Sequence, residues 1–148
     1  MSRESPLAGA LRDKGFSGRA IQRGEVYLIK DEVLSLPETR LPGLERELHE
    51  RRPVLVVQGD EDNTNVFCRT VLVAPLSTRT DLKGKQDIEL SCKETGLSRP
   101  SIAMLGLVQP ILKTDLAPGV GRLSEECFTD VLNTLLCNLG VLKRQSDE

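Results

Sequence analysis

The sequence has few of the residues that metal sites and nucleophilic catalysis need. It contains one histidine, His49, and four widely spaced cysteines without a C-x-x-C pair, which is too little for a common zinc site. A Ser-His-Asp or Cys-His arrangement would have to use His49. The motifs G-x-x-x-x-G-K-[ST], G-x-S-x-G and H-E-x-x-H are also absent. We therefore expect no metal, no cofactor, and reduced, mostly buried thiols.

Long hydrophobic runs are missing as well. No stretch approaches the roughly 20 apolar residues of a membrane-spanning helix, and residues 1–20 lack the apolar segment of a signal peptide. We expect a cytoplasmic protein with no membrane contact. The net charge of -2 gives no overall attraction to nucleic acid, so any such binding must come from a local patch.

A length of 148 residues fits one domain. Residues 1–20 are rich in glycine, serine and charge and are predicted to be a flexible N-terminal extension. Residues 143–148 are predicted to be a disordered tail. The folded domain is then 21–142.

Short strand-like segments dominate this domain. GEVYLIK from Gly24 and the alternating DIEL at 87–90 predict strands, and the apolar runs PVLVVQ (53–58) and TVLVAPL (70–76) predict central strands. The run SIAMLGLVQPIL from Ser101 is interrupted by Gly106 and Pro110, which predicts a bend or an edge. Residues 31–52 form a long connection in which LERELHE favours a helical turn, with Leu44 and Leu48 on one face.

The last element is predicted as an amphipathic helix from Ser124 to Leu139. Ser124 is a good N-cap, Leu123 can pack on Phe128, and Gly140 supplies a stop. An apolar face is expected to cover the sheet, and it consists of Phe128, Val131, Leu132, Leu135, Leu136 and Leu139. The sequence therefore predicts a mainly β fold with a C-terminal helix, a small barrel or curved sheet.

Two polar segments are candidates for chemistry. Arg51 and Arg52 stand where the long connection enters a buried strand, and a guanidinium suits bidentate binding of phosphate. Alternatively, these arginines have no functional role and only pair with Glu45, Glu47 or Glu50 at the surface. The second segment is PLSTRT (75–80), which is followed by Lys83 and Lys85. Alternatively, PLSTRT is only a hydroxyl-rich turn at the end of a strand, with no functional role.

These segments together resemble the MazF/PemK family of toxin endoribonucleases. The matching pieces occur in family order over about Arg23 to Leu142. They are RGEVYLI from Arg23, RRPVLVVQ from Arg51, Asn63 and Asn65, TVLVAPLST from Thr70, GLSRPSIAML from Gly96 and VGRLSEE from Val120.

The resemblance implies an SH3-like small β-barrel of the CcdB/MazF type, a homodimer, an acidic antitoxin partner and metal-independent cleavage of single-stranded RNA. In that scheme the 2′-hydroxyl attacks the adjacent phosphate and leaves a cyclic phosphate. Arg52 matches the family's catalytic arginine, and Ser77 falls where the family generally has a catalytic threonine. The RNA-binding candidates are Arg51, Asn65, Thr78, Arg79, Lys83 and Lys85.

The sequence departs from the family pattern at three places. The connection before Arg51 is long and charged, Ser77 replaces threonine, and LVQPI at 107–111 stands where members often have a Gln-Ile-Arg-Thr run. The long connection also brings in His49, whose ordinary pKa suits proton transfer near neutrality. More often such a loop histidine is simply exposed to solvent.

Two other functions are compatible with the same resemblance. A CcdB-like relative binds DNA gyrase and has no nuclease chemistry, and a degenerate member would bind RNA or a partner without cutting. Arg52 together with the Ser77 hydroxyl favours the nuclease, because a gyrase-binding protein has no need of that pair.

Overall fold

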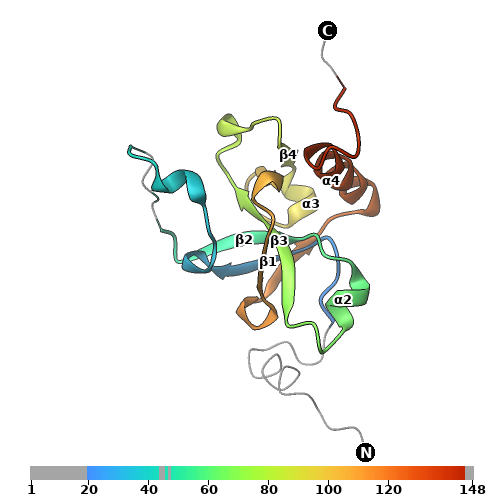
Figure 1. Cartoon of the computed structure of the whole chain (residues 1–148). Coiled ribbons are helices and arrows are strands. Elements are labelled where there is room, and N and C mark those ends of the chain that lie inside the picture. Colours follow the sequence, from blue (N-terminus) through green and yellow to red (C-terminus); the bar gives the residue numbers. More distant parts are fainter. Residues whose placement is uncertain (1–19, 44–45, 47, 146–148) are drawn as a thin grey trace, which may run out of the picture.

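The computed structural model describes residues 20–43, 46 and 48–145 of the chain. Its framework is a seven-stranded antiparallel sheet (Figure 1). The strands are β1 (Glu25–Lys30), β2 (Arg51–Val56), β3 (Thr70–Ser77), β4 (Asp87–Leu90), β5 (Ser101–Met104), β6 (Gln109–Leu112) and β7 (Gly119–Arg122). The helices are α2 (Asp60–Thr64), α3 (Cys92–Thr95) and α4 (Glu125–Asn138).

The sheet curls because β3 changes partners along its length. Its order is β4-β5-β3-β2-β1-β7, and β6 also pairs with β3. One edge of β3 pairs with β2 through Val73–Pro75; the other pairs with β6 at Thr70–Val73 and with β5 at Leu76–Ser77. The result is a half-barrel closed by a C-terminal helix, which confirms the predicted fold class.

The central strands carry apolar runs because both of their faces are buried over much of their length. Tyr27, Ile29, Val54 and Val56 belong to one core cluster, whereas Val26, Leu55 and Val57 belong to a second. The second cluster also contains Phe128 and Val131 of α4. Alternate side chains of β1 and β2 therefore enter two different cores, and the predicted central position of residues 53–58 and 70–76 is confirmed.

The predicted interruption after Ser101 is also confirmed. A 3-10 turn, η4 (Leu105–Leu107), contains Gly106 and separates β5 from β6. Pro110 lies within β6 opposite Leu72. Among the strand pairings of the described residues, β6 pairs only with β3, so the missing N–H of proline is accommodated at an edge.

The helix α4 has the predicted ends. The Ser124 side chain accepts a hydrogen bond from the backbone N of Cys127, and Leu123 and Phe128 are both buried. Gly140 has φ +77°, and the amide of Val141 donates to the Leu136 carbonyl, which completes a Schellman stop.

The predicted apolar face of α4 is only partly buried. Phe128 and Val131 are buried, Leu132, Leu135 and Leu136 are half-buried, and Leu139 is 69% exposed. The expectation that all six side chains cover the sheet was wrong: Leu132 and Leu135 still pack against the second core cluster, whereas Leu139 lies beyond the last residue of α4 and is exposed. Full burial of two side chains contributes about 3–6 kcal/mol before entropy.

Several local expectations need correction. GDEDNTN forms the one-turn helix α2, and β7 and α3 are elements that the pattern did not predict. Within LERELHE, the described residues Arg46, Leu48 and His49 lie in no helix, and Leu48 is 62% exposed. The helical turns of this connection are instead η1 (Asp31–Val33) and η2 (Pro37–Arg40). Leu44 lies outside the described residues.

The thiols are free, as expected, but they are not buried. Cys92 is exposed, and Cys68, Cys127 and Cys137 are half-buried. Of these four, Cys127 packs against the second core cluster without being fully buried. The expectation of mostly buried cysteines was wrong.

The predicted extension at 1–20 lies almost entirely outside the described residues. In the predicted tail at 143–148, Arg144 donates hydrogen bonds to the Lys85 carbonyl and to Asn138. Across the described part of the chain, no helix is long and apolar enough to cross a membrane.

Candidate functional site

A buried carboxylate organises the site. Asp31 directly follows β1, and its side chain is fully buried. It accepts hydrogen bonds from Arg52 Nε at 2.7 Å, from the His49 backbone N at 2.9 Å and from Arg46. Arg46 also donates to the Leu34 carbonyl at 2.7 Å. Asp31, the first residue of the long connection, thereby forms hydrogen bonds with residues near the end of the same connection.

The charge on Asp31 is stabilised by these donors. Burial alone raises the pKa of a carboxyl group, but the hydrogen bonds from His49, Arg52 and Arg46 outweigh it and hold the pKa of Asp31 below its ordinary value of 3.8. Asp31 therefore remains ionised near neutrality and keeps Arg52 oriented.

Arg52 is aimed at the end of β3. Its Nη1 donates to the Leu76 carbonyl at 3.4 Å, and Ser77 is the next residue. Its Nη2 has no hydrogen-bond partner among the described residues. Only 12% of the side chain is exposed, so the guanidinium is held at the surface with one edge available to a phosphate.

Arg52 has an ion-pair partner that the sequence analysis did not name. The salt bridge joins Arg52 to Asp31, and neither Asp31 nor Arg46 had been singled out. The available signal was Asp31 directly after a strand whose last residue, Lys30, pairs with Arg51. Glu45 and Glu47 lie outside the described residues.

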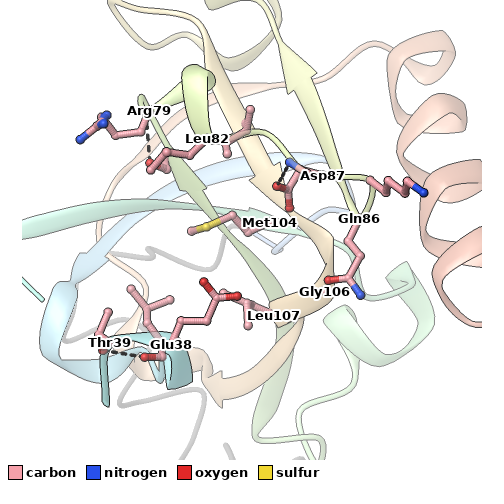
Figure 2. Close-up of a pocket in the computed structure, with 14 residues that line it drawn as sticks. Glu38, Thr39, Arg79, Leu82, Gln86, Asp87, Met104, Gly106 and Leu107 are labelled. Atoms are coloured by element: carbon pink, nitrogen blue, oxygen red, sulfur yellow. Dashed lines mark hydrogen bonds between the residues drawn. The ribbon is translucent and has the colours of Figure 1, made fainter. Parts of the chain in front are cut away.

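Ser77 lines a cleft of about 560 Å³. One wall comes from η2 and the residue before it, and the other comes from the segment after β3 (Figure 2). The Ser77 hydroxyl oxygen accepts a hydrogen bond from the Arg79 backbone N at 3.2 Å. Its own proton remains available for donation into the cleft.

The segment after β3 brings several predicted residues together. Thr78, Arg79, Lys83 and Lys85 are all exposed here, and Arg79 and Lys85 line the cleft. Arg79 forms a two-point ion pair with Asp81 at 2.9 and 3.0 Å, which raises the pKa of Arg79 and lowers that of Asp81.

Arg51, His49 and Asn65 lie elsewhere. Arg51 and His49 line a separate pocket of about 290 Å³ together with Asp31. Asn65 follows α2 at the opposite end of β2 and β3, roughly 17–20 Å of strand away from Arg52. Its carbonyl, with those of Asp62 and Asn63, accepts a hydrogen bond from the buried ammonium of Lys113. The structure therefore gathers Arg52 with Ser77 but leaves Asn65 apart.

Three or more metal-ligating side chains do not come together anywhere in the described ranges. The chemistry at Arg52 and Ser77 consists of charge and hydrogen bonding. Such a pair can orient a phosphodiester and stabilise added negative charge on its oxygens.

Comparison with protein families identifies the chain. Residues 22–139 match the family described as the PemK-like, MazF-like toxin of type II toxin-antitoxin systems. The protein belongs to this toxin family. The match contains Arg52, Ser77 and the whole of α4, which confirms the resemblance predicted from the sequence. Comparison with curated protein sequences finds no match.

Solved structures share the fold at low sequence identity. A mycobacterial endoribonuclease in complex with its cognate antitoxin has 17% identity and a TM-score of 0.61, covering 84% of this chain and 100% of that one. The Mycobacterium tuberculosis toxin MazF-mt6 has 18% identity and a TM-score of 0.59, with coverages of 80% and 98%.

A third structure, MazE-MazF from Deinococcus radiodurans, has 15% identity and a TM-score of 0.58. It covers 83% of this chain and 98% of that chain. The half-barrel with its C-terminal helix is therefore the MazF-like fold.

Proposed function

We propose that this toxin is a metal-independent endoribonuclease that cleaves single-stranded RNA. The observation that carries the proposal is that a buried Asp31 orients the Arg52 guanidinium toward the Leu76 carbonyl, next to Ser77, which lines the cleft. Membership of a toxin family and the endoribonucleases among its structural relatives support the same chemistry.

The reaction needs no covalent intermediate with the protein. The ribose 2′-hydroxyl loses its proton as its oxygen forms a bond to the adjacent phosphorus, the bond from phosphorus to the 5′-oxygen breaks, and that oxygen takes up a proton. The products are a cyclic phosphate and a 5′-hydroxyl. The Arg52 guanidinium stays charged, so it is a poor base and acts through its charge on the pentavalent transition state. Ser77 donates a hydrogen bond to the same phosphate.

The remaining roles follow from location. The cations Arg79, Lys83 and Lys85 attract the RNA backbone to the cleft, and Thr78 adds a hydroxyl. Arg51 and Asn65, which lie outside the cleft, contact more distant nucleotides of a longer strand. His49 is the candidate for proton transfer.

We further propose that the protein acts in the cytoplasm as a homodimer restrained by an acidic antitoxin. A disordered acidic segment of the antitoxin fits the cationic side of the cleft and competes there with RNA. One solved relative is described as an endoribonuclease in complex with its cognate antitoxin, and another as MazE-MazF.

The test is cleavage of a long RNA in EDTA, with the new ends mapped and analysed for cyclic phosphate. We expect metal-independent cleavage, about a hundredfold slower in Ser77→Ala and about a thousandfold slower in Arg52→Ala. Ser98→Ala, which changes an exposed serine outside the cleft, is the matched control. Intact RNA with the wild-type protein would refute the proposal, and inhibition of gyrase by the same protein would favour the CcdB-like alternative.

A further inference from the structure

The cleft beside Ser77 has two unlike sides. Arg79, Leu82 and Lys85 stand on one side, and Glu38 and Thr39 of η2 stand on the other. Figure 2 shows Glu38 and Thr39 across the cleft from Arg79 and Leu82, with the Glu38 carboxylate directed into the space near Leu107. An RNA strand in this cleft therefore meets cations on one side and a carboxylate on the other.

Glu38 is the carboxylate in the cleft that is available to a ligand. The other one, Asp87, accepts a hydrogen bond from the Gly84 backbone N at 2.8 Å. The Thr39 hydroxyl beside Glu38 donates to the Leu36 carbonyl at 2.6 Å. Glu38 is exposed, and its carboxylate has no hydrogen-bond or ion-pair partner among the described residues.

The turn that carries Glu38 is anchored to the barrel. Gln109 of β6 binds both backbone groups of Ser35, accepting from its N at 2.8 Å and donating to its carbonyl at 3.0 Å. Arg46 holds the Leu34 carbonyl. Because these contacts lie three and four residues before Glu38, the backbone that carries its side chain is tied to β6.

A carboxylate in this position repels phosphate but suits a nucleobase. Leu36, Met104 and Leu107 supply apolar surface for the faces of a base, and the cations opposite take the phosphate. A carboxylate has two acceptor oxygens. Guanine matches them, since its Watson–Crick edge presents two adjacent donors, N1–H and N2–H. Adenine and cytosine present one donor beside an acceptor, and uracil presents one donor between two acceptors.

We propose that Glu38 selects guanine at a nucleotide that flanks the scissile phosphate. This inference rests on the proposed function, because it takes the Ser77 cleft as the place where RNA binds. It assigns the base preference to the long connection in which this sequence departs from its family.

The inference is tested by binding rather than by cleavage. The probes are hexanucleotides of uridine in which one central uridine is replaced by guanosine, adenosine or cytidine. Every sugar carries 2′-fluorine, so the probes lack the attacking 2′-hydroxyl and cannot be cleaved. We expect the wild-type protein to bind the guanine probe about tenfold more tightly than the adenine probe. Glu38→Gln, with one acceptor and one donor, is expected to reverse this order in favour of adenine. Glu61→Gln, an exposed glutamate of α2, is expected to leave it unchanged.

The two proposals fail in different ways. Equal binding of the three probes, no measurable binding, or an unchanged order in Glu38→Gln would overturn the guanine assignment, even if the protein cleaves RNA. A guanine preference that is lost in Glu38→Gln, together with intact 2′-hydroxyl RNA, would uphold guanine selection by Glu38 in the cleft and refute the nuclease.

Discussion

At the scale of single residues, Asp31 determines where Arg52 can act. A lone buried carboxylate is costly, but Asp31 receives donors from Arg46, Arg52 and the His49 backbone. Arg52 in turn donates a hydrogen bond from Nε to Asp31, and its Nη2 remains available to a ligand. The same ion pair thus stabilises the fold and orients the proposed catalytic group.

Asp31→Asn is expected to lower the free energy of unfolding at pH 7 by about 3–5 kcal/mol, because two arginines lose their charged partner. The pKa of Asp31 is lowered by folding, so its stabilisation is present above about pH 3.8 and is lost as the pH falls through the folded-state pKa. Urea unfolding followed by circular dichroism between pH 7 and pH 2.5 measures this. The wild type and the variant should therefore converge in acid; a gap that stays constant over this range contradicts the assignment.

Arg52→Ala is expected to weaken the fold as well as the chemistry. Asp31 keeps Arg46 and the His49 amide as partners in this variant, so the loss stays below the roughly 3–5 kcal/mol of an isolated buried pair. A circular dichroism spectrum like that of the wild type, with a lower melting temperature, is the expected result. With the fold retained, the loss of cleavage in Arg52→Ala can be attributed to the missing guanidinium rather than to unfolding.

The imidazole of His49 offers a separate test. His49 shares the smaller pocket with Arg51, away from the cleft that Ser77 lines. If His49 transfers a proton during cleavage, the rate profile between pH 5.5 and 8 is bell-shaped in the wild type and flat in His49→Gln. Identical profiles in the two proteins would remove His49 from the mechanism.

At the scale of elements, two glycines allow α3 to meet β7. A Cβ on Gly121 would lie 2.2 Å from the Thr95 carbonyl oxygen, and one on Gly96 would lie 2.1 Å from the Val120 carbonyl oxygen. Gly96 also has φ +78°. Both glycines belong to the segments that resemble the family, and backbone contact between the segments explains why glycine is needed there.

Gly121→Ala is therefore expected to destabilise the protein by several kcal/mol, because backbone must move and Gly121 also pairs with Val26 in the sheet. Gly84→Ala is the matched control, since its Cβ would lie 3.6 Å from the nearest atom, Asp87 Oδ2. The measurement is the melting temperature of each variant, which we expect to be lower for Gly121→Ala than for Gly84→Ala. Equal melting temperatures would show that the α3–β7 contact can relax.

At the scale of the whole molecule, the net charge of -2 rules out attraction of RNA by the overall field. The cations that matter are local: Arg79 and Lys85 line one side of the cleft, and the exposed Lys83 lies between them in the chain. Because Arg79 is already paired with Asp81, we assign most of the phosphate attraction to the two lysines.

Replacing Lys83 and Lys85 with glutamine is expected to weaken RNA binding and to flatten its salt dependence. Each lost phosphate contact reduces the slope of log K against log salt by about 0.7 for a single strand, so the double variant should lose about 1.4. Fluorescence anisotropy with the 2′-fluoro hexanucleotides between 50 and 200 mM salt measures the slope. Lys93→Gln on α3 is the control, and a slope change as large in that variant would place the RNA elsewhere.

Much of the fold was predictable because the signals are local. The alternation of DIEL, the apolar runs of the central strands, the Ser124 cap and the Gly140 stop each depend on neighbouring residues. Motif order was also sufficient to identify the family. The extent of burial on α4 was not predictable, because periodicity shows which face is apolar but not how far the sheet extends beneath it.

The sequence by itself determined most of the strands, the final helix and the candidate pair Arg52 and Ser77, whereas β7 was not predicted. Only the tertiary structure decided that Arg52 binds Asp31, 21 residues earlier, and that Glu38 faces the Ser77 cleft. Asn65, in contrast, lies at the far end of the strands. The physical reason is that hydrogen-bond and charge partners are selected by proximity in space, and the curl of the sheet around β3 creates that proximity.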